Sequence, residues 1–231
     1  MTMIETYIKE LVTYGLNKGL VDPADEIYVT NRLLELFDIQ EYNEPAEIPS
    51  RPLVDILNDM LDYAYQHKLM EDDTITNRDL FDTKIMGMLT PAPSVVRKIF
   101  ADKYAVSPKE ATNYYYAFSK ATNYIREDRI EKDEKWVTET EYGPIDITIN
   151  LSKPEKDPRD IAKAGKAKKS GYPACLLCRE NEGYAGHFSH PARQNHRIMP
   201  ITLDGQAYYL QYSLMCTTTS TVLSLMQTTH Q

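Results

Sequence analysis

The spacing of apolar residues changes near residue 132, and this change constrains the fold more than any other feature of the chain. Before it, apolar side chains recur every three or four residues, as on one face of a helix; Ile4 to Leu16 and Leu53 to Tyr65 show this clearly. After it, apolar and polar residues alternate, as along a half-buried strand. We therefore predict an α+β protein whose helical region, residues 1–132, comes first.

Capping residues and prolines divide the helical region into several helices. Asp22-Pro23 and Ser107-Pro108 each place a capping side chain directly before a proline in the first helical turn. The second of these helices is expected to run toward Ile125. Further helices are predicted from about 76 to 88 and, with Ser94 as the cap, to about 103.

Two β-hairpins are predicted in the rest of the chain. The first covers 136–151 and turns at Gly143-Pro144, with its apolar residues on one face of the second strand. The second covers 196–212 and turns at Asp204-Gly205, a pair that strongly favours a two-residue hairpin turn. The apolar residues that share one face of the second strand in the first hairpin are Ile145, Ile147, Ile149 and Leu151.

Charge and hydropathy exclude some classes of partner. The formal net charge of −8 argues against a general nucleic-acid binder, which normally carries a basic face. The lysine-rich run from Lys163 to Lys169 is either a solvated helix face or an anchor for a phosphate. The chain has no run of about 18 apolar residues and no leader-like N-terminus. We expect a cytoplasmic protein without membrane or nucleic-acid partners.

The stretch from Tyr172 to Arg197 holds most of the chemistry-bearing side chains. Cys175 and Cys178 form a Cys-x-x-Cys pair, whose thiolates can bind one zinc ion. A buried structural pair and a redox pair are the alternatives, although a redox pair usually opens a helix after a strand. Three histidines, His187, His190 and His196, are near enough to complete a zinc site or to cap strands.

Polar donors end this stretch at alternating positions. Arg193, Asn195 and Arg197 would share one face if the segment were a strand. Guanidinium groups bind phosphate oxygens bidentately, and an amide can meet both a donor and an acceptor of a base or a sugar. The pattern fits either surface residues of an ordinary strand or a row of donors for a nucleotide pyrophosphate.

Several long motifs resemble one enzyme family. The segments DEIYVTNRLLELF, WVTETEYGPIDITINLSKPEKDP and CLLCRENEGYAGHFSHPARQNHRIMPITLDGQAYYLQYS look like the N-terminal part of class II UDP-glucose–hexose-1-phosphate uridylyltransferases, the galactose-1-phosphate uridylyltransferases of the Firmicutes type. The resemblance runs from Met1 to about Ser213. It implies that residues 133–213 begin a histidine-triad-like transferase domain.

The resemblance also implies an activity and a set of site residues. The family transfers UMP between UDP-glucose and galactose 1-phosphate through a uridylyl-histidine intermediate, and a full-length member is expected to be a homodimer. By analogy with the class I enzymes, Cys175 and Cys178 match a zinc-binding pair, while Arg193, Asn195 and Arg197 match the region of uridine-diphosphate contacts. The nucleophilic histidine belongs to a later His-x-His motif, so we predict no catalytic residue in this chain.

The tail from 214 to 231 resembles nothing in the family. Restoring one base after Ser213 converts a possible coding sequence of this tail into PYVYYNEHCIVFNADHTP, which has the strand-like alternation expected after QYS. We therefore expect a frameshifted, truncated fragment without turnover, in which 198–212 has an unpaired sheet edge.

Two rival functions remain open from the residues alone. One is a small zinc-binding interaction module built on Cys175 and Cys178, with no catalytic activity. The other is a nucleic-acid-binding protein that uses the lysine-rich run, which the acidic net charge disfavours.

Overall fold

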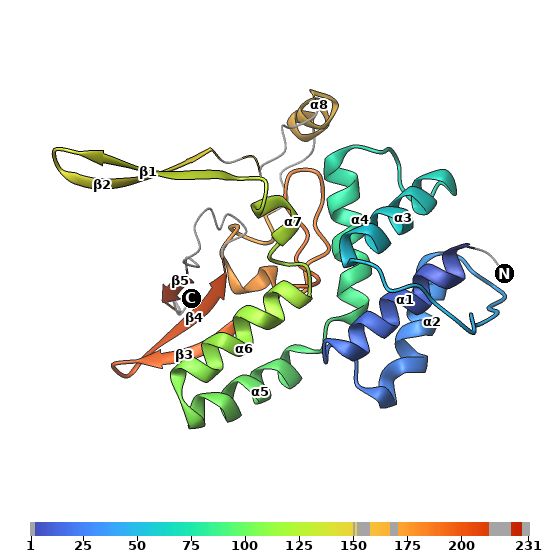
Figure 1. The fold of residues 1–231 in the computed structure, drawn as a ribbon, viewed down its shortest axis with the longest axis horizontal. Helices are drawn as coiled ribbons and strands as arrows, with labels where there is room; N and C mark the ends of the chain where they lie inside the picture. Colours follow the sequence, from blue (N-terminus) through green and yellow to red (C-terminus); the bar gives the residue numbers. More distant parts are fainter. Residues whose placement is uncertain (1–2, 150, 152–157, 167–170, 213–222, 228–231) are drawn as a thin grey trace.

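Helices precede hairpins in the computed structural model, which describes residues 3–149, 151, 158–166, 171–212 and 223–227 (Figure 1). This order confirms the α+β prediction. The helices of the first 132 residues are α1 (Met3–Asn17), the 3₁₀ turn η1 (Pro23–Asp25), α2 (Glu26–Leu36), α3 (Leu53–Gln66), α4 (Ile75–Leu89), α5 (Pro93–Val106), α6 (Pro108–Ala121) and α7 (Glu127–Ile130). They are followed by β1 (Glu134–Thr140), β2 (Gly143–Ile149), α8 (Pro158–Lys166), η2 (Arg179–Asn181), β3 (Met199–Leu203), β4 (Gln206–Tyr212) and β5 (Leu223–Gln227).

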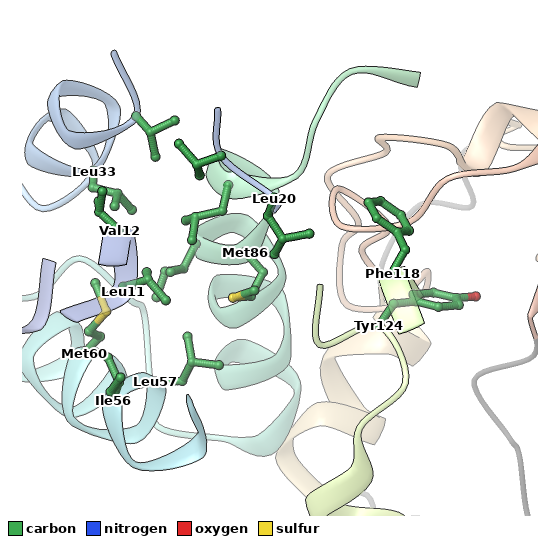
Figure 2. Packing of buried hydrophobic residues seen from close by; sticks show 14 of the residues in the cluster. Leu11, Val12, Leu20, Leu33, Ile56, Leu57, Met60, Met86, Phe118 and Tyr124 are labelled. Atoms are coloured by element: carbon green, nitrogen blue, oxygen red, sulfur yellow. The ribbon is translucent and has the colours of Figure 1, made fainter. Parts of the chain in front are cut away.

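The hydrophobic core is centred on α1, which contacts α2 and α3, while α4 packs against both of these. Ile4, Ile8 and Leu11 lie one helical turn apart on α1 and are fully buried. Figure 2 shows Leu11 close to Met60 of α3, with Met86 of α4 on the other side of the cluster. The helical spacing in the sequence therefore predicts the buried face of α1 correctly.

Three helix boundaries differ from the predicted ones. Asp22 caps a 3₁₀ turn, and α2 itself begins only at Glu26. Thr74 caps α4, two residues before the expected start. Ser94 is not a cap, because Pro93 already occupies the first turn of α5, where the fixed φ of proline suits a helix.

The helix opened at Ser107 begins as predicted and ends early. Its cap is confirmed, since the Ser107 hydroxyl accepts a hydrogen bond from the Glu110 amide at 3.1 Å. The helix α6 ends at Ala121 rather than near Ile125, because Asn123 takes a positive φ of 54° that breaks the helical run. The chain then forms the short helix α7.

Ion pairs attach α7 to α4. Arg126 pairs with the fully buried Asp82, and Arg129 pairs with Asp79. Burial raises the pKa of Asp82, and the positive charge of Arg126 opposes that effect. These pairs fix the point from which the β1–β2 hairpin leaves the helices.

The first hairpin projects away from the helices (Figure 1). Its strands pair antiparallel with Thr140 opposite Gly143, so Glu141 and Tyr142 form the turn. The prediction of a turn at Gly143-Pro144 is wrong by two residues. Pro144 instead lies within β2, which is an edge strand of this two-stranded sheet, where a missing amide donor is tolerated.

The second hairpin packs against the helices and has a third strand. Its turn at Asp204-Gly205 is confirmed, with φ values of 49° and 76° that fit a type I′ turn. Strand β3 begins only at Met199, so the predicted strand from 196 is too long at its start. Met199, Leu210 and Tyr212 join the hydrophobic cluster of the helices.

The expectation of an unpaired sheet edge at 198–212 is wrong for β4. This strand pairs with β3 on one side and with β5 on the other, with Tyr212 opposite Leu223. The remainder of the expected out-of-frame tail, 214–222 and 228–231, lies outside the described residues.

The basic run begins in α8, where it meets acidic residues. Lys163 forms ion pairs with Glu71 and Asp72 in the connection between α3 and α4, at 2.9 and 2.7 Å. This lysine therefore neutralises protein carboxylates. Lys168 and Lys169 lie outside the described residues.

Candidate functional site

The Cys-x-x-Cys pair lies on a turn that the buried side chain of Asn181 holds from inside. The Asn181 amide nitrogen donates to the carbonyl oxygens of Cys175 at 2.7 Å and Cys178 at 2.9 Å. Gln211 of β4 donates to the carbonyl of Leu177 at 2.8 Å. Three of the four carbonyls of this turn are thus bound by amide side chains.

The two cysteines are free thiols that lie against one another. Cys175 is exposed and Cys178 is half-buried. The hydrogen bond with Cys175, followed by burial, raises the pKa of the Cys178 thiol to about 11. Cys178 is therefore not the lowered-pKa thiol that an activated redox pair uses as its nucleophile.

The thiol pair fits two of the four positions of a tetrahedral zinc site. Within the described residues, no group of three or more histidine, cysteine, aspartate or glutamate side chains is arranged to hold a metal ion. Zinc binding by Cys175 and Cys178 therefore stays a prediction, and the described part of the chain supplies no third ligand.

Two of the three histidines in the stretch are tied into the loop. His187 and His190 form a β-bridge through their main chains, and the His187 ring accepts a hydrogen bond from the Ser189 amide at 3.2 Å. The His190 Nε2 donates to the Asn181 Oδ1 at 2.6 Å. Burial, with His187 next, lowers the pKa of His190, so its ring is neutral near pH 7.

His196 is a fully buried neutral ring. It stacks on Tyr124 with centroids 4.1 Å apart, and its Nε2 lies 3.3 Å from the Gln211 Oε1. Burial, aided by the charge of Arg193, lowers the pKa of His196 to about 3. Through these contacts, His196 links Tyr124, in the segment between α6 and α7, to Gln211 of β4.

The structure brings Arg193, Asn195 and Arg197 into one buried segment but not onto one strand. They lie in a loop before β3, so the expected alternation of strand neighbours is wrong. Arg193 lies over the Tyr124 ring, with its guanidinium carbon 5.7 Å from the centroid. Asn195 donates to the Thr122 carbonyl at 2.8 Å, which joins the loop to the end of α6.

Arg197 joins the loop to the end of α4. Its guanidinium donates to the carbonyls of Pro91 at 2.7 Å and Thr90 at 3.1 Å, and to two carbonyls of its own loop. Burial lowers the pKa of Arg197 to about 10. Main-chain carbonyls accept the side-chain hydrogen bonds of Arg193, Asn195 and Arg197, which therefore hold the loop in place. The role of these three residues as substrate contacts stays a prediction that the fold does not test.

Beside the Cys-x-x-Cys turn lies an open polar hollow of about 430 Å³. Arg97 on its wall pairs with Glu182 at 2.6 Å, and Arg179 donates to the Tyr209 hydroxyl at 3.0 Å. Guanidinium and tyrosine groups at such a wall suit an anionic or polyhydroxylated ligand. The residues that line the hollow are Arg97, Tyr172, Arg179, Glu180, Glu182, Pro200 and Tyr209.

Sequence reasoning missed the residues that build this site from within. Asn181, Gln211 and Glu182 anchor the turn and the loop, and Glu182 also accepts from the Ile198 amide at 2.8 Å. The only local signal was the position of Asn181, three residues after Cys178. Nothing in the alternating pattern of β4 distinguishes Gln211 from a surface residue.

None of the helices in the described ranges is both long and apolar enough to cross a membrane.

Comparisons with known proteins give one consistent result. Residues 19–213 match the sequence model of a family described as galactose-1-phosphate uridyl transferase, N-terminal domain. Proteins named galactose-1-phosphate uridylyltransferase from Clostridium acetobutylicum and Butyrivibrio fibrisolvens are 52% and 50% identical over 213 residues, or 91% of this chain. The protein of that name from Bacillus subtilis is 45% identical over 217 residues.

The chain spans only part of these relatives. The matched region covers 42% of the Clostridium acetobutylicum protein, 54% of the Butyrivibrio fibrisolvens protein and 42% of the Bacillus subtilis protein. No solved structure matches the chain significantly.

Proposed function

Because this chain belongs to the galactose-1-phosphate uridyl transferase family, we propose that it forms the N-terminal part of an enzyme that moves UMP between UDP-glucose and galactose 1-phosphate. The match over residues 19–213 carries this proposal. The tightly anchored loop between Tyr172 and Ile198 supports it, because a transferase needs its binding groups on a rigid frame.

We propose a covalent mechanism for the whole enzyme. A histidine attacks the α-phosphorus of UDP-glucose and releases glucose 1-phosphate, and galactose 1-phosphate then takes the uridylyl group from that histidine. The four histidines of the described residues are engaged otherwise: the ring of His67 bonds the Tyr63 carbonyl, that of His187 accepts from the Ser189 amide, His190 binds Asn181, and His196 is buried. We therefore assign the nucleophile to none of them and expect no turnover by this chain alone.

Cys175 and Cys178 would hold zinc in the complete enzyme. Zinc bound to two thiolates supplies a structural cross-link rather than a reacting group. Cys175 is exposed and Cys178 half-buried on a turn, which suits completion of the site by ligands from other parts of the enzyme. Nothing in the described residues favours the alternative of a self-contained zinc-binding module, since they bring no third ligand to the pair.

We propose that the sugar nucleotide lies near the loop of Arg193, Asn195 and Arg197. Among the described residues, the Arg193 guanidinium makes fewer hydrogen bonds than that of Arg197: one, to the adjacent Ala192 carbonyl at 3.3 Å. In the hollow beside the turn, Arg179 is the guanidinium closest to the cysteines in sequence. Arg179 and Arg193 are replaced separately in an active enzyme to distinguish the two positions. The substitution that removes a phosphate contact should raise KM for UDP-glucose.

A chimera tests the proposed family function directly. The part of this chain that aligns with the Clostridium acetobutylicum protein, at 52% identity over 213 residues, replaces the corresponding part of that protein. We expect the chimera to exchange label between UDP-glucose and glucose 1-phosphate within about tenfold of the parent, because a correctly folded N-terminal part keeps its binding groups. A folded chimera without exchange contradicts the proposal.

The unmodified chain is the second test. We expect the purified 231-residue protein to show no exchange under conditions in which the intact relative is active. Exchange by this chain that disappears when one of its five histidines is replaced contradicts the assignment of the nucleophile to another part of the enzyme.

A further inference from the structure

The apolar side chains of the turn that carries the two cysteines are only partly buried. Leu176 and Leu177, the residues between the cysteines, are 53% and 44% exposed. Hydrophobic burial therefore does little to fix this turn. Its conformation depends on hydrogen bonds to its carbonyl groups.

Asn181 supplies most of these hydrogen bonds. Its side chain is completely buried, and its amide nitrogen donates to the carbonyls at both ends of the turn, those of Cys175 and Cys178. Its main-chain amide also donates to the Cys178 carbonyl, at 3.0 Å. The Asn181 Oδ1 accepts from His190, which orients the amide group so that its nitrogen faces the turn.

Gln211 holds the middle of the turn from the opposite side. It donates to the Leu177 carbonyl, while its own oxygen faces the buried ring of His196. The turn is thus bound by an asparagine from the loop and a glutamine from β4. The Asn181 side chain binds two of the three carbonyls, and that of Cys175 also accepts from the Cys178 amide at 3.4 Å.

We propose that Asn181 is a positioning residue that holds the Cys175 and Cys178 thiols together as a pre-formed pair for one thiol-seeking ion or metalloid. A pre-formed pair binds such a ligand tightly because the entropy of bringing the two sulfur atoms together is already lost on folding. The inference concerns the thiol pair alone and does not depend on uridylyl transfer.

The probe is phenylarsine oxide, which needs only two neighbouring thiols. The arsenic atom forms one bond to each sulfur, and its oxygen leaves as water with the two thiol protons. The experiment uses the whole reduced chain with Cys216→Ser, so that Cys175 and Cys178 are the only thiols. No sugar nucleotide is present, so failure here is distinct from failure of the chimera.

We expect Asn181→Ala and Asn181→Asp to weaken binding of the arsenical at least about tenfold, the lower end of what loss of an outer-shell hydrogen bond costs in metal affinity. Asp is informative because a carboxylate can still accept from His190 but cannot donate to the two carbonyls. His190→Phe removes the bond that orients the Asn181 amide but leaves both of its donors, so we expect a smaller loss of binding than in Asn181→Ala.

Asn195→Ala is the matched control. Asn195 is also a buried asparagine that donates to a main-chain carbonyl, but its partner is Thr122. Circular dichroism identifies the variants that are folded at the assay temperature. A folded Asn181→Asp or Asn181→Ala chain that binds like the parent overturns the proposal, and so does an equal loss of binding in Asn195→Ala.

Discussion

The two hairpins of this chain have similar strand patterns and opposite surroundings. In β3–β4, Met199, Leu210 and Tyr212 are buried against the helices. In β1–β2, nearly every residue is at least partly exposed, including Trp136 and Ile149. Alternation therefore predicts that a segment is a strand but does not indicate what covers its apolar face.

Polar contacts explain the difference as much as apolar ones do. The Tyr212 ring lies 4.7 Å from that of Tyr115, and the Tyr212 carbonyl accepts from Tyr124 at 3.0 Å. The hairpin β1–β2 follows directly after α7, which the pairs of Arg126 and Arg129 join to α4. One hairpin belongs to the core, whereas the other is joined to it at one end.

The largest expected effect comes from removing a buried aromatic side chain from β4. Tyr212→Ala should lower the free energy of unfolding by about 3–5 kcal/mol, because it leaves a cavity where a buried aromatic ring packs. Ile149→Ala, at a half-exposed position of β2, should lower it by less than about 1 kcal/mol. Urea unfolding of both variants measures the difference. Equal losses would mean that both hairpins contribute equally to the core.

The ion pair between Arg126 and Asp82, just before the exposed hairpin, should contribute more to the free energy of unfolding than the side chains of the hairpin do. Arg126→Met should cost about 3 kcal/mol, because it leaves the buried carboxylate of Asp82 without its charged partner. The cost lies at the lower end of the usual range since Asn123 still donates to Asp82, at 3.3 Å. The double variant Arg126→Met, Asp82→Leu is the control and should regain part of the loss. If Arg126→Met unfolds like the parent in urea, the pair does not anchor α7.

The contrast also indicates which parts of the fold the sequence could predict. Asp204-Gly205 marks its turn locally, because both residues take positive φ values that few residues accept. Gly143-Pro144 gave the same kind of signal two residues too late. The register places Thr140 opposite Gly143 and so puts the turn at Glu141 and Tyr142. This register depends on pairing along the whole hairpin.

The candidate site was predictable only in part. The adjacency of Cys175 and Cys178 follows from their spacing on a turn. The loop conformation of 193–197 does not, because Asn195 and Arg197 bind carbonyls of residues more than 70 positions earlier in the chain. Their alternation suggested a strand, and long-range hydrogen bonds override that local pattern.

The buried histidine beside β4 should make stability depend on pH. The pKa of His196 is about 3 in the folded chain and near 6.5 in the unfolded one, so only the unfolded state gains a proton between these values. The free energy of unfolding should therefore fall as pH drops below 6.5, by up to about 1.4 kcal/mol per pH unit. His196→Phe keeps the stacking position on Tyr124 and should flatten this slope in urea titrations at pH 4.5–6.5. An unchanged slope would assign the dependence to other groups.

The smallest effect compares a glycine of the β3–β4 turn with the first residue of β2. Gly205 and Gly143 have φ values of 76° and 105°, which alanine adopts only with strain. Gly205→Ala should lower the free energy of unfolding by about 1 kcal/mol, because β3–β4 unfolds only with the core. Gly143→Ala should lower it by less than about 0.5 kcal/mol, because the exposed hairpin can open locally and release its strain.

Hydrogen exchange tests whether this local opening occurs. The amides of β1 that pair with β2 should exchange faster in Gly143→Ala, while the amides of α1 and β4 keep the rates of the parent. The result follows from burial: the free energy of local opening is small where few apolar contacts are lost, and β1 has almost none to lose. If Gly143→Ala instead accelerates exchange in α1 as well, β1–β2 unfolds together with the core, and the two hairpins differ in exposure but not in cooperativity.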